Sequence, residues 1–419
     1  MTQSEKKIPS NDDGLHDYSI SPKVVEDIQP WLLFENKKKE DIYLIGNKEL
    51  DRYFTVPKSN VDIVLGIVSF FDGKHSIEWI ENHYYTKKKK QIDVMSLYEM
   101  FSKSGLITDP KPAEVEHGEF EQLSIKVASF DIKKIFEFCS SIASDLVRWG
   151  VWTSLLIIAV GIFFLVRAPE VLLSSRNFHI PGFAGFLFLY AAIILCVIMH
   201  EFSHAITATT YGILPIKFEI NLYLGFLLVF FLKMAGLYTL KPKQRLIVWG
   251  AGVYMNLTLG CLFIIVAHLT NLSLFYEQFL ARVAFINFFI AVFNLLPLLP
   301  TDGYFIMSTV FKKANLRTRT WREFKNWVTF KQHKFKGDVV VYFILTISLI
   351  IWLLSVHLYW IIKSTSEGKP FDIRLYYPFI IIAVIMMRKL LAKIVLKIIA
   401  VWKNGHNTEQ PALEEKTIT

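Results

Sequence analysis

The strongest constraint on the fold is a series of apolar runs, each long enough to cross a lipid bilayer as a helix. A transmembrane helix needs about 20 predominantly apolar residues. Six runs of about that length occur, at approximately 149–166, 184–208, 246–267, 282–304, 339–362 and 375–400. Hydrophobic residues make up 53% of the 419 positions, more than the interior of a soluble protein of this size accommodates. We therefore expect a multi-pass α-helical membrane protein with about six transmembrane helices.

Basic residues predict how these helices are oriented. Residues 312–336 carry nine Lys or Arg and a single acidic residue, Glu323. Such a run between two apolar spans is typical of a cytoplasmic loop, and nucleic-acid binding is the weaker alternative. The first 30 residues lack an apolar core, so we expect no cleavable signal peptide and a cytoplasmic N-terminus. Six crossings then leave both termini and every basic cluster in the cytoplasm.

The first 148 residues are polar to mixed and predict a small domain ahead of the membrane spans. DIYLIGNKELDRYFTVP (41–57) predicts a β-hairpin, the segments on either side of Asp72-Gly73 predict two helices, and VMSLYEMFSKSGLI predicts a third that ends at Gly105. We expect a cytoplasmic α+β winged-helix-like domain over residues 28–109. Its twelve Lys or Arg balance its twelve Asp or Glu, which argues against nucleic acid as a partner. A peptide or protein partner is favoured, and a passive cytoplasmic cap is the alternative.

The whole chain then divides into seven predicted parts. They are a flexible N-terminus (1–27), the winged-helix-like peptide-recognition domain (28–109), a linker and amphipathic segment (110–148), a membrane-embedded core (149–310), a basic cytoplasmic loop (311–338), two C-terminal transmembrane helices (339–403) and a polar tail (404–419). Within the core, LYLGFLLVFFL (222–232) is too short to cross as a helix and predicts a re-entrant or interfacial segment. IKFEINLYL (216–224) alternates as a strand does. It is either an edge that holds an extended substrate or a simple interfacial hairpin.

The second apolar run contains three ionisable residues in CVIMHEFSHAITATTYG (196–212). His200 and His204 are four residues apart, so a helix presents both imidazoles on one face, at the spacing that holds one Zn²⁺. Glu201 lies beside that face, where it can act as a general acid and base. Ionisable groups at membrane depth are costly and usually functional. The alternative is a pair of structural histidines hydrogen-bonded between helices.

A catalytic zinc site needs a third protein ligand, and the fourth apolar run offers one. Asp302, in NLLPLLPTDGY (294–304), is the only acidic residue between positions 283 and 322. Pro297 and Pro300 are expected to break the helix just before it, and a broken helix at membrane depth is tolerated where it lines a polar cavity or is buried in protein. The predicted topology places Asp302 at the level of His200 and His204. Because PTDG also favours a turn, Asp302 can be a turn residue as well as a ligand.

HEFSH together with NLLPLLPTDG resembles the signature of the site-2 protease family of intramembrane zinc metalloproteases. The resemblance covers about 184–310. It implies a Zn²⁺ ion held by His200, His204 and Asp302, with Glu201 as the catalytic acid and base. AGVYMN (251–256) is similar to a further segment of that family, although Val253 stands where proline is usual. By the same analogy Asn294 and Asn256 help to position the substrate, and an interhelical hydrogen bond is the alternative role for Asn294.

The predicted N-terminal domain resembles the peptide-recognition domains of pathways that modify ribosomally made peptides, including the peptide chaperone of pyrroloquinoline quinone synthesis. The features that carry the resemblance are the YLIGNKELDRYFTV hairpin, DGKHSIEWI and LYEMFSKSGLI. In those domains a leader peptide adds a strand to the edge of the hairpin. The resemblance therefore implies an enzyme that binds a precursor peptide in the cytoplasm and cuts it at the membrane.

Three functions remain open at this stage. The first is maturation of a small precursor peptide by a metalloprotease of a bacterial cell membrane. The second is regulated proteolysis of a membrane-anchored regulator by the same chemistry. The third is a catalytically silent membrane protein for peptide export or immunity, although a site that only binds metal would not need Glu201. Expected partners are the lipid bilayer and a peptide or transmembrane-protein substrate, without nucleic acid, and the sequence does not indicate an oligomeric state.

Overall fold

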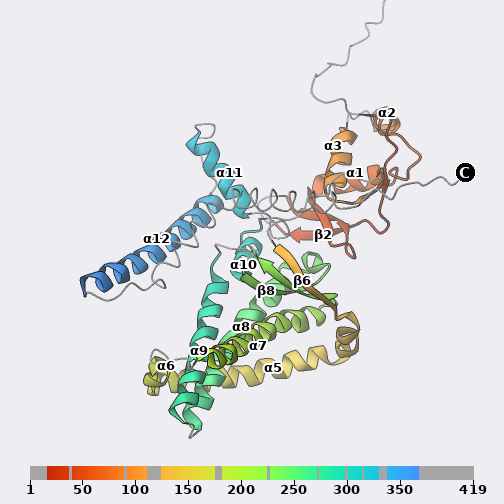
Figure 1. The fold of residues 1–419 in the computed structure, drawn as a ribbon. Coiled ribbons are helices and arrows are strands. Elements are labelled where there is room, and N and C mark those ends of the chain that lie inside the picture. Colours follow the sequence, from red (N-terminus) through yellow and green to blue (C-terminus); the bar gives the residue numbers. More distant parts are fainter. Residues whose placement is uncertain are drawn as a thin grey trace, which may run out of the picture. The chain divides into compact units, whose positions relative to one another are not determined.

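The computed structural model (Figure 1) describes residues 17–36, 40–88, 92–110, 124–174, 182–223, 227–270, 273–297, 301–313, 316–329 and 337–367. The chain divides into two compact units, Met1–Asn315 and Leu316–Thr419. The first unit holds a small α+β region, a second small sheet and the long apolar helices. The predicted flexible N-terminus up to residue 16 and the predicted polar tail (404–419) lie outside the described residues.

The N-terminal domain is built on an antiparallel sheet in the order β2–β3–β4. The predicted hairpin is confirmed as β3 (Ile42–Asn47) and β4 (Arg52–Pro57), while β2 (Gln29–Phe34) was not predicted. The three predicted helices are also present, and a short strand pair completes the domain: α1 (Lys58–Val68), α2 (Ile77–Lys88), α3 (Val94–Lys103), and β1 (Lys23–Val24) with β5 (Ile107–Asp109). Ile45, Ile67 and Phe101 are fully buried at the centre of one apolar core.

A second antiparallel sheet has the order β6–β7–β8. The alternating segment 216–224 forms β7 (Lys217–Tyr223), and the short apolar run after it contributes β8 (Leu227–Lys233). Its first strand, β6 (Ser124–Asp131), comes from the segment expected to be a linker, and helix α5 (Lys133–Arg167) begins only two residues later. One face of this sheet packs Phe218 and Leu232 against Phe202 of the next long helix.

Four helices of the described residues are long and apolar enough to cross a membrane. They are α5, α7 (Gly182–Thr209), α8 (Pro242–Leu269) and α9 (Leu274–Leu295). Helix α8 packs against each of the other three (Figure 1), and the short α6 (Pro169–Ser174) contacts α9. Large apolar side chains such as Trp152, Leu156 and Phe289 are exposed on these helices, as a lipid-facing surface requires.

The helix break predicted within the span 282–304, just before Asp302, is confirmed. Helix α9 ends at Leu295, and a separate helix, α10 (Asp302–Val310), begins after the break. The expected cause is proline, which lacks the backbone N–H that would continue the helix and disfavours helical geometry in the residue before it. Because of the break, Asp302 is the first residue of a new helix and does not continue the helix of the span.

The second unit contains α11 (Leu316–Val328) and α12 (Gly337–Ser366). The predicted basic loop therefore includes a helix, in which Arg319 forms an ion pair with Glu323 at 3.1 Å. The predicted fifth span (339–362) falls inside α12, where Val339–Ser348 is a shorter apolar stretch. The predicted sixth span (375–400) lies outside the described residues.

Candidate metal centre

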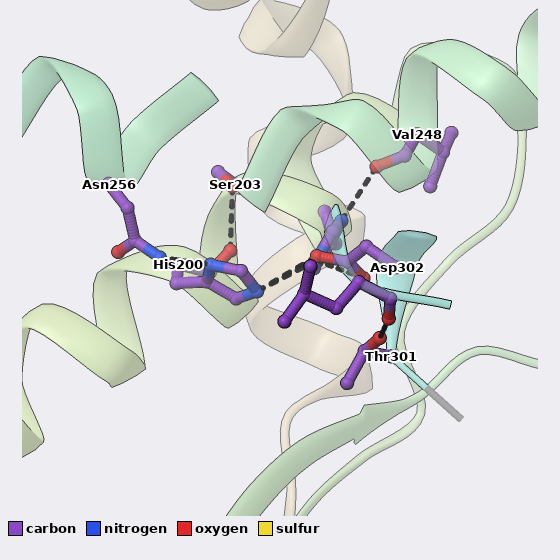
Figure 2. A network of polar contacts seen from close by, with 8 residues as sticks. His200, Ser203, Val248, Asn256, Thr301 and Asp302 are labelled. Carbon is purple, nitrogen blue, oxygen red and sulfur yellow. Dashed lines mark hydrogen bonds and ion pairs between the residues drawn. The ribbon is translucent and has the colours of Figure 1, made fainter. Parts of the chain in front are cut away.

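His200 and His204 lie on one face of α7, as their spacing predicts, and both are almost completely buried. Asp302, at the start of α10, meets them from a different helix (Figure 2). Its Oδ2 atom lies 3.3 Å from Nε2 of His200, and its Oδ1 atom lies 3.3 Å from Nε2 of His204. The two Nε2 atoms are 3.2 Å apart. The three side chains thus aim one ligand atom each at a common point.

These separations fit a zinc ion. Zn²⁺ binds histidine nitrogen and carboxylate oxygen at about 2.0–2.2 Å in tetrahedral sites, and this radius sets ligand atoms about 3.3–3.6 Å apart. All three atoms lie within 4.8 Å of one another, so the group could hold a metal ion. Two imidazoles and one carboxylate also leave the fourth position open, as catalytic zinc sites do. The predicted ligand set is therefore brought together in space.

The orientation of His204 is fixed by a backbone carbonyl. Nδ1 of His204 lies 2.6 Å from the carbonyl oxygen of Val248 on α8, to which it donates its proton (Figure 2). A proton on Nδ1 leaves the lone pair of Nε2 free to bind a metal. The role of Val248 was not predicted, because every residue type has a backbone carbonyl and the sequence does not show which one makes a contact.

His200 is oriented in the same way by a side chain. Its Nδ1 lies 2.8 Å from the amide of Asn256, which is fully buried in α8. If Nε2 is to bind a metal, Nδ1 carries the proton, and Asn256 must present its oxygen as the acceptor. The same amide orientation gives a partner to the Asn256 Oδ1 atom, which is otherwise buried without one. Asn256 thus contacts one of the two imidazoles of the candidate metal site.

Helix α8 approaches the two histidines closely at Gly252. A Cβ atom at this position would lie 2.4 Å from Nε2 of His204 and 2.5 Å from Nε2 of His200. No side chain fits there while the rings keep their positions. The physical reason for glycine in the AGVYMN segment is therefore the space taken by the two imidazoles.

Asp302 is placed by the helix break. Thr301 precedes it as the N-cap residue of α10, and the Thr301 hydroxyl donates to the carbonyl oxygen of Leu296 at 2.8 Å, across the break. Asp302 itself is 9% exposed. The turn role and the ligand role expected from PTDG are thus compatible.

Glu201 is half-buried and follows His200 on α7. The backbone N–H of Leu232 in β8 lies near its carboxylate. Among the described strands β8 pairs only with β7, so one edge of β8 is not paired. The strand at the edge of this sheet therefore lies next to the carboxylate beside the metal-binding face.

Asn294 stands apart from this network. It is half-buried near the C-terminal end of α9, and in the described part of the chain it makes no hydrogen bond to His200, His204 or Asp302. Its predicted role in substrate positioning stays a prediction.

Comparison of the chain with protein-family models gives no match, and no curated protein or solved structure matches it. The function of the chain is therefore inferred from the geometry of the site itself.

Proposed function

We propose that this chain is an intramembrane zinc metalloendopeptidase of the site-2 protease type, which hydrolyses a peptide bond in a membrane-associated or small precursor peptide. The observation that carries the proposal is the convergence of His200, His204 and Asp302 from two helices, at separations of 3.2–3.3 Å, with Glu201 next to them. A purely structural histidine pair would need neither the carboxylate from α10 nor the adjacent glutamate.

Each residue of the site then has a chemical role. His200, His204 and Asp302 hold the zinc ion, and Val248 and Asn256 keep the two imidazoles in the required tautomer. A bound zinc ion supplies Lewis acidity and lowers the pKa of water towards about 7. Glu201 takes a proton from the attacking water and transfers it to the leaving amine, as the new C–O bond forms and the C–N bond breaks. The N–H dipole of Leu232, near the Glu201 carboxylate, stabilises the negative charge that this carboxylate carries before it takes the proton.

The open edge of β8 offers a place for the substrate backbone. A helical substrate keeps its carbonyls in its own hydrogen bonds, so it must be extended before it is cut. An edge strand provides unpaired N–H and C=O groups that hold a chain in extended form. Because Leu232 of β8 lies near Glu201, a substrate strand added to β8 would run close to the catalytic carboxylate.

The N-terminal domain suggests which substrates reach this edge. Its resemblance to leader-peptide-binding domains implies a precursor peptide that adds a strand to an edge of the sheet. Among the described strands β4 pairs only with β3, and Phe54 of β4 packs against Phe101 of α3, so one edge is available next to a helix. We propose that the protein spans a bacterial cell membrane six times, with both termini in the cytoplasm, where such precursors are made.

The ligand and base assignments are tested by zinc analysis of the detergent-purified chain. Wild type and Glu201→Gln are expected to hold about one zinc per chain, because Glu201 is not a ligand. Asp302→Asn is expected to hold less, and Asp62→Asn, at an exposed site in α1, serves as its control. A wild type without zinc, or an Asp302→Asn variant with the full amount, would show that the three-ligand site is wrong.

Peptidase activity is tested separately. Membranes from cells that produce wild type or Glu201→Gln are compared by mass spectrometry for new peptide termini. We expect termini that depend on Glu201, with a rate at least about 100-fold lower in Glu201→Gln, since general acid–base catalysis contributes at least that factor. New termini in small precursor peptides support the proposal, and termini in membrane-anchored regulators favour regulated proteolysis. Zinc binding with no Glu201-dependent terminus contradicts the enzyme assignment.

A further inference from the structure

Arg245, near the start of α8, is one of the largest fully buried side chains of the chain and is 1% exposed. A buried charge is costly unless it is paired and hydrogen-bonded. No carboxylate of the described residues lies within ion-pair distance of Arg245. Its partners come instead from β2 of the N-terminal domain: Nη2 donates to the carbonyl oxygen of Leu33, and the guanidinium lies 5.2 Å from the ring centroid of Phe34. The charge on α8 is therefore stabilised by another domain.

The carbonyl of Leu33 is available for this contact because of a strand irregularity. Leu32 and Phe34 both have register partners in β3, but the register shifts between them and Leu33 has none. A backbone carbonyl at such an irregularity needs another donor if it is buried. Leu33 is 2% exposed, so Arg245 satisfies a group that the sheet itself leaves unpaired.

A second contact joins the same two parts of the chain. The carboxylate of Asp51, at the β3–β4 turn, accepts the backbone N–H of Gly236 at 2.9 Å. Gly236 has a left-handed backbone (φ 87°) and precedes the short helix η2 (Leu237–Thr239), which packs against β2. Burial raises the pKa of Asp51. The carboxylate is thus enclosed in the junction.

A third contact reaches the helix that carries Asp302. The ammonium group of Lys312, two residues beyond the end of α10, donates to the carbonyl oxygen of Glu35, directly after β2. Helix α10 also packs on α8, where Trp249 stacks on Phe305 with ring centroids 4.6 Å apart. The junction therefore includes α10, which carries Asp302, and α8, which orients the two histidines.

On α8, the residue that contacts the N-terminal domain is close in sequence to the residues that contact the two histidines. Val248, whose carbonyl orients His204, is three residues after Arg245, and Gly252 and Asn256 follow on the next turns of the same helix. A rotation or shift of the start of α8 moves all three against the imidazoles. Metal sites tolerate errors in ligand position of only about 0.2 Å. The position of the start of α8 therefore has a direct effect on the site.

We propose that the N-terminal domain holds in place the start of α8, which orients the two histidines, and helix α10, which carries Asp302, with Arg245 as the positioning residue at the junction. The inference rests on the proposed function, because the metal centre that it concerns is the one assigned to peptide hydrolysis. Strand β2 and the β3–β4 turn form the junction, while the unpaired edge of β4 lies on the side of the sheet opposite β2. A precursor peptide on β4 would leave the junction intact, so substrate binding and an ordered metal site are compatible.

The test measures zinc affinity on the full chain in detergent, by competition with a chromophoric chelator. Arg245→Met keeps side-chain length and removes the hydrogen bond and charge, and we expect zinc to bind about tenfold more weakly, as for other groups that orient metal ligands. Arg245→Lys restores a donor to Leu33 and is expected to recover most of the affinity, which a general packing defect would not. Lys243→Met, at an exposed position of the same turn, is the matched control and is expected to bind as wild type.

A variant in the other domain covers the case in which Arg245→Met does not fold. Asp51→Ala leaves α8 unchanged and removes the acceptor for Gly236, and it too is expected to weaken zinc binding, whereas Asp62→Ala, at an exposed site in α1, is not. Folded Arg245→Met or Asp51→Ala protein that binds zinc as wild type does would overturn the inference. A different result would contradict the proposed function. In that case His200→Ala would hold zinc as tightly as wild type does.

Discussion

At Gly252, the addition of one methyl group is expected to weaken metal binding while the chain still folds. In Gly252→Ala the new Cβ would lie 2.4 Å from Nε2 of His204 and 2.5 Å from Nε2 of His200, whereas ordinary contacts begin at 3.4 Å. One or both rings, or α8 itself, must therefore move by about 1 Å, which is several times the error of about 0.2 Å that a metal site tolerates.

The expected loss follows from this displacement. Mutation of groups that merely orient metal ligands costs about 10–100-fold in affinity, and here the ligand atoms themselves are displaced. We expect Gly252→Ala to bind zinc at least about 100-fold more weakly, which is about 2.8 kcal/mol. Gly250→Ala is the matched control, because it adds the same methyl group to the same helix and the new Cβ would meet nothing within 4 Å.

The assay is a competition titration of the detergent-solubilised apo-protein against a chromophoric zinc chelator. Size-exclusion profiles of the two variants establish that both are folded. If Gly252→Ala binds zinc as tightly as Gly250→Ala, then α8 does not approach the histidines as described, and the roles of Val248 and Asn256 on the same helix are also wrong.

Two further predictions concern single hydrogen bonds. Asn256→Ala removes the acceptor for Nδ1–H of His200 and should weaken zinc binding about tenfold. Asn256→Asp keeps an acceptor oxygen and should bind zinc as wild type does. Equal zinc affinities of the two variants in the same titration would contradict the contact. Burial raises the pKa of Asp51 above its ordinary value of 3.8, so the folded chain holds this proton more tightly than the unfolded chain. The stability that Asp51 contributes is therefore fully present below pH 3.8 and is lost as the pH rises through the folded-state pKa. Denaturant unfolding of wild type and Asp51→Asn across this range should show wild type losing stability relative to the variant, and a constant difference would refute the shift.

Local patterns predicted the parts of this fold that depend on neighbouring residues. The hairpin at 41–57, the three helices of the N-terminal domain and the end of α9 before Pro297 all follow from propensity, turn residues and proline chemistry. The spacing of His200 and His204 likewise places both on one face of α7. Asp302 could be proposed because an acidic residue is rare in an apolar segment.

The remaining features depend on contacts between distant segments. Strand β6 pairs with β7 across about 90 residues, as the ion pair between Lys126 and Glu219 at 2.8 Å illustrates, and nothing near residue 126 indicates that partner. The hydrogen bond that His204 donates to Val248 uses a backbone carbonyl, which every residue type has. Asn256 was recognised as a candidate, but its contact with His200 required the packing of α8 on α7.

The buried guanidinium also has a consequence for biosynthesis. Arg245 and the Leu33 carbonyl that receives its hydrogen bond are 212 positions apart, and the strand with the acceptor is translated first. Domains generally fold as units, with the N-terminal one first, as the chain leaves the ribosome. The N-terminal domain can thus fold before α8 is made, and the arginine then meets a strand that is already in place. A truncated chain without that domain would leave the Arg245 cation without its hydrogen-bond partner, which destabilises the start of α8.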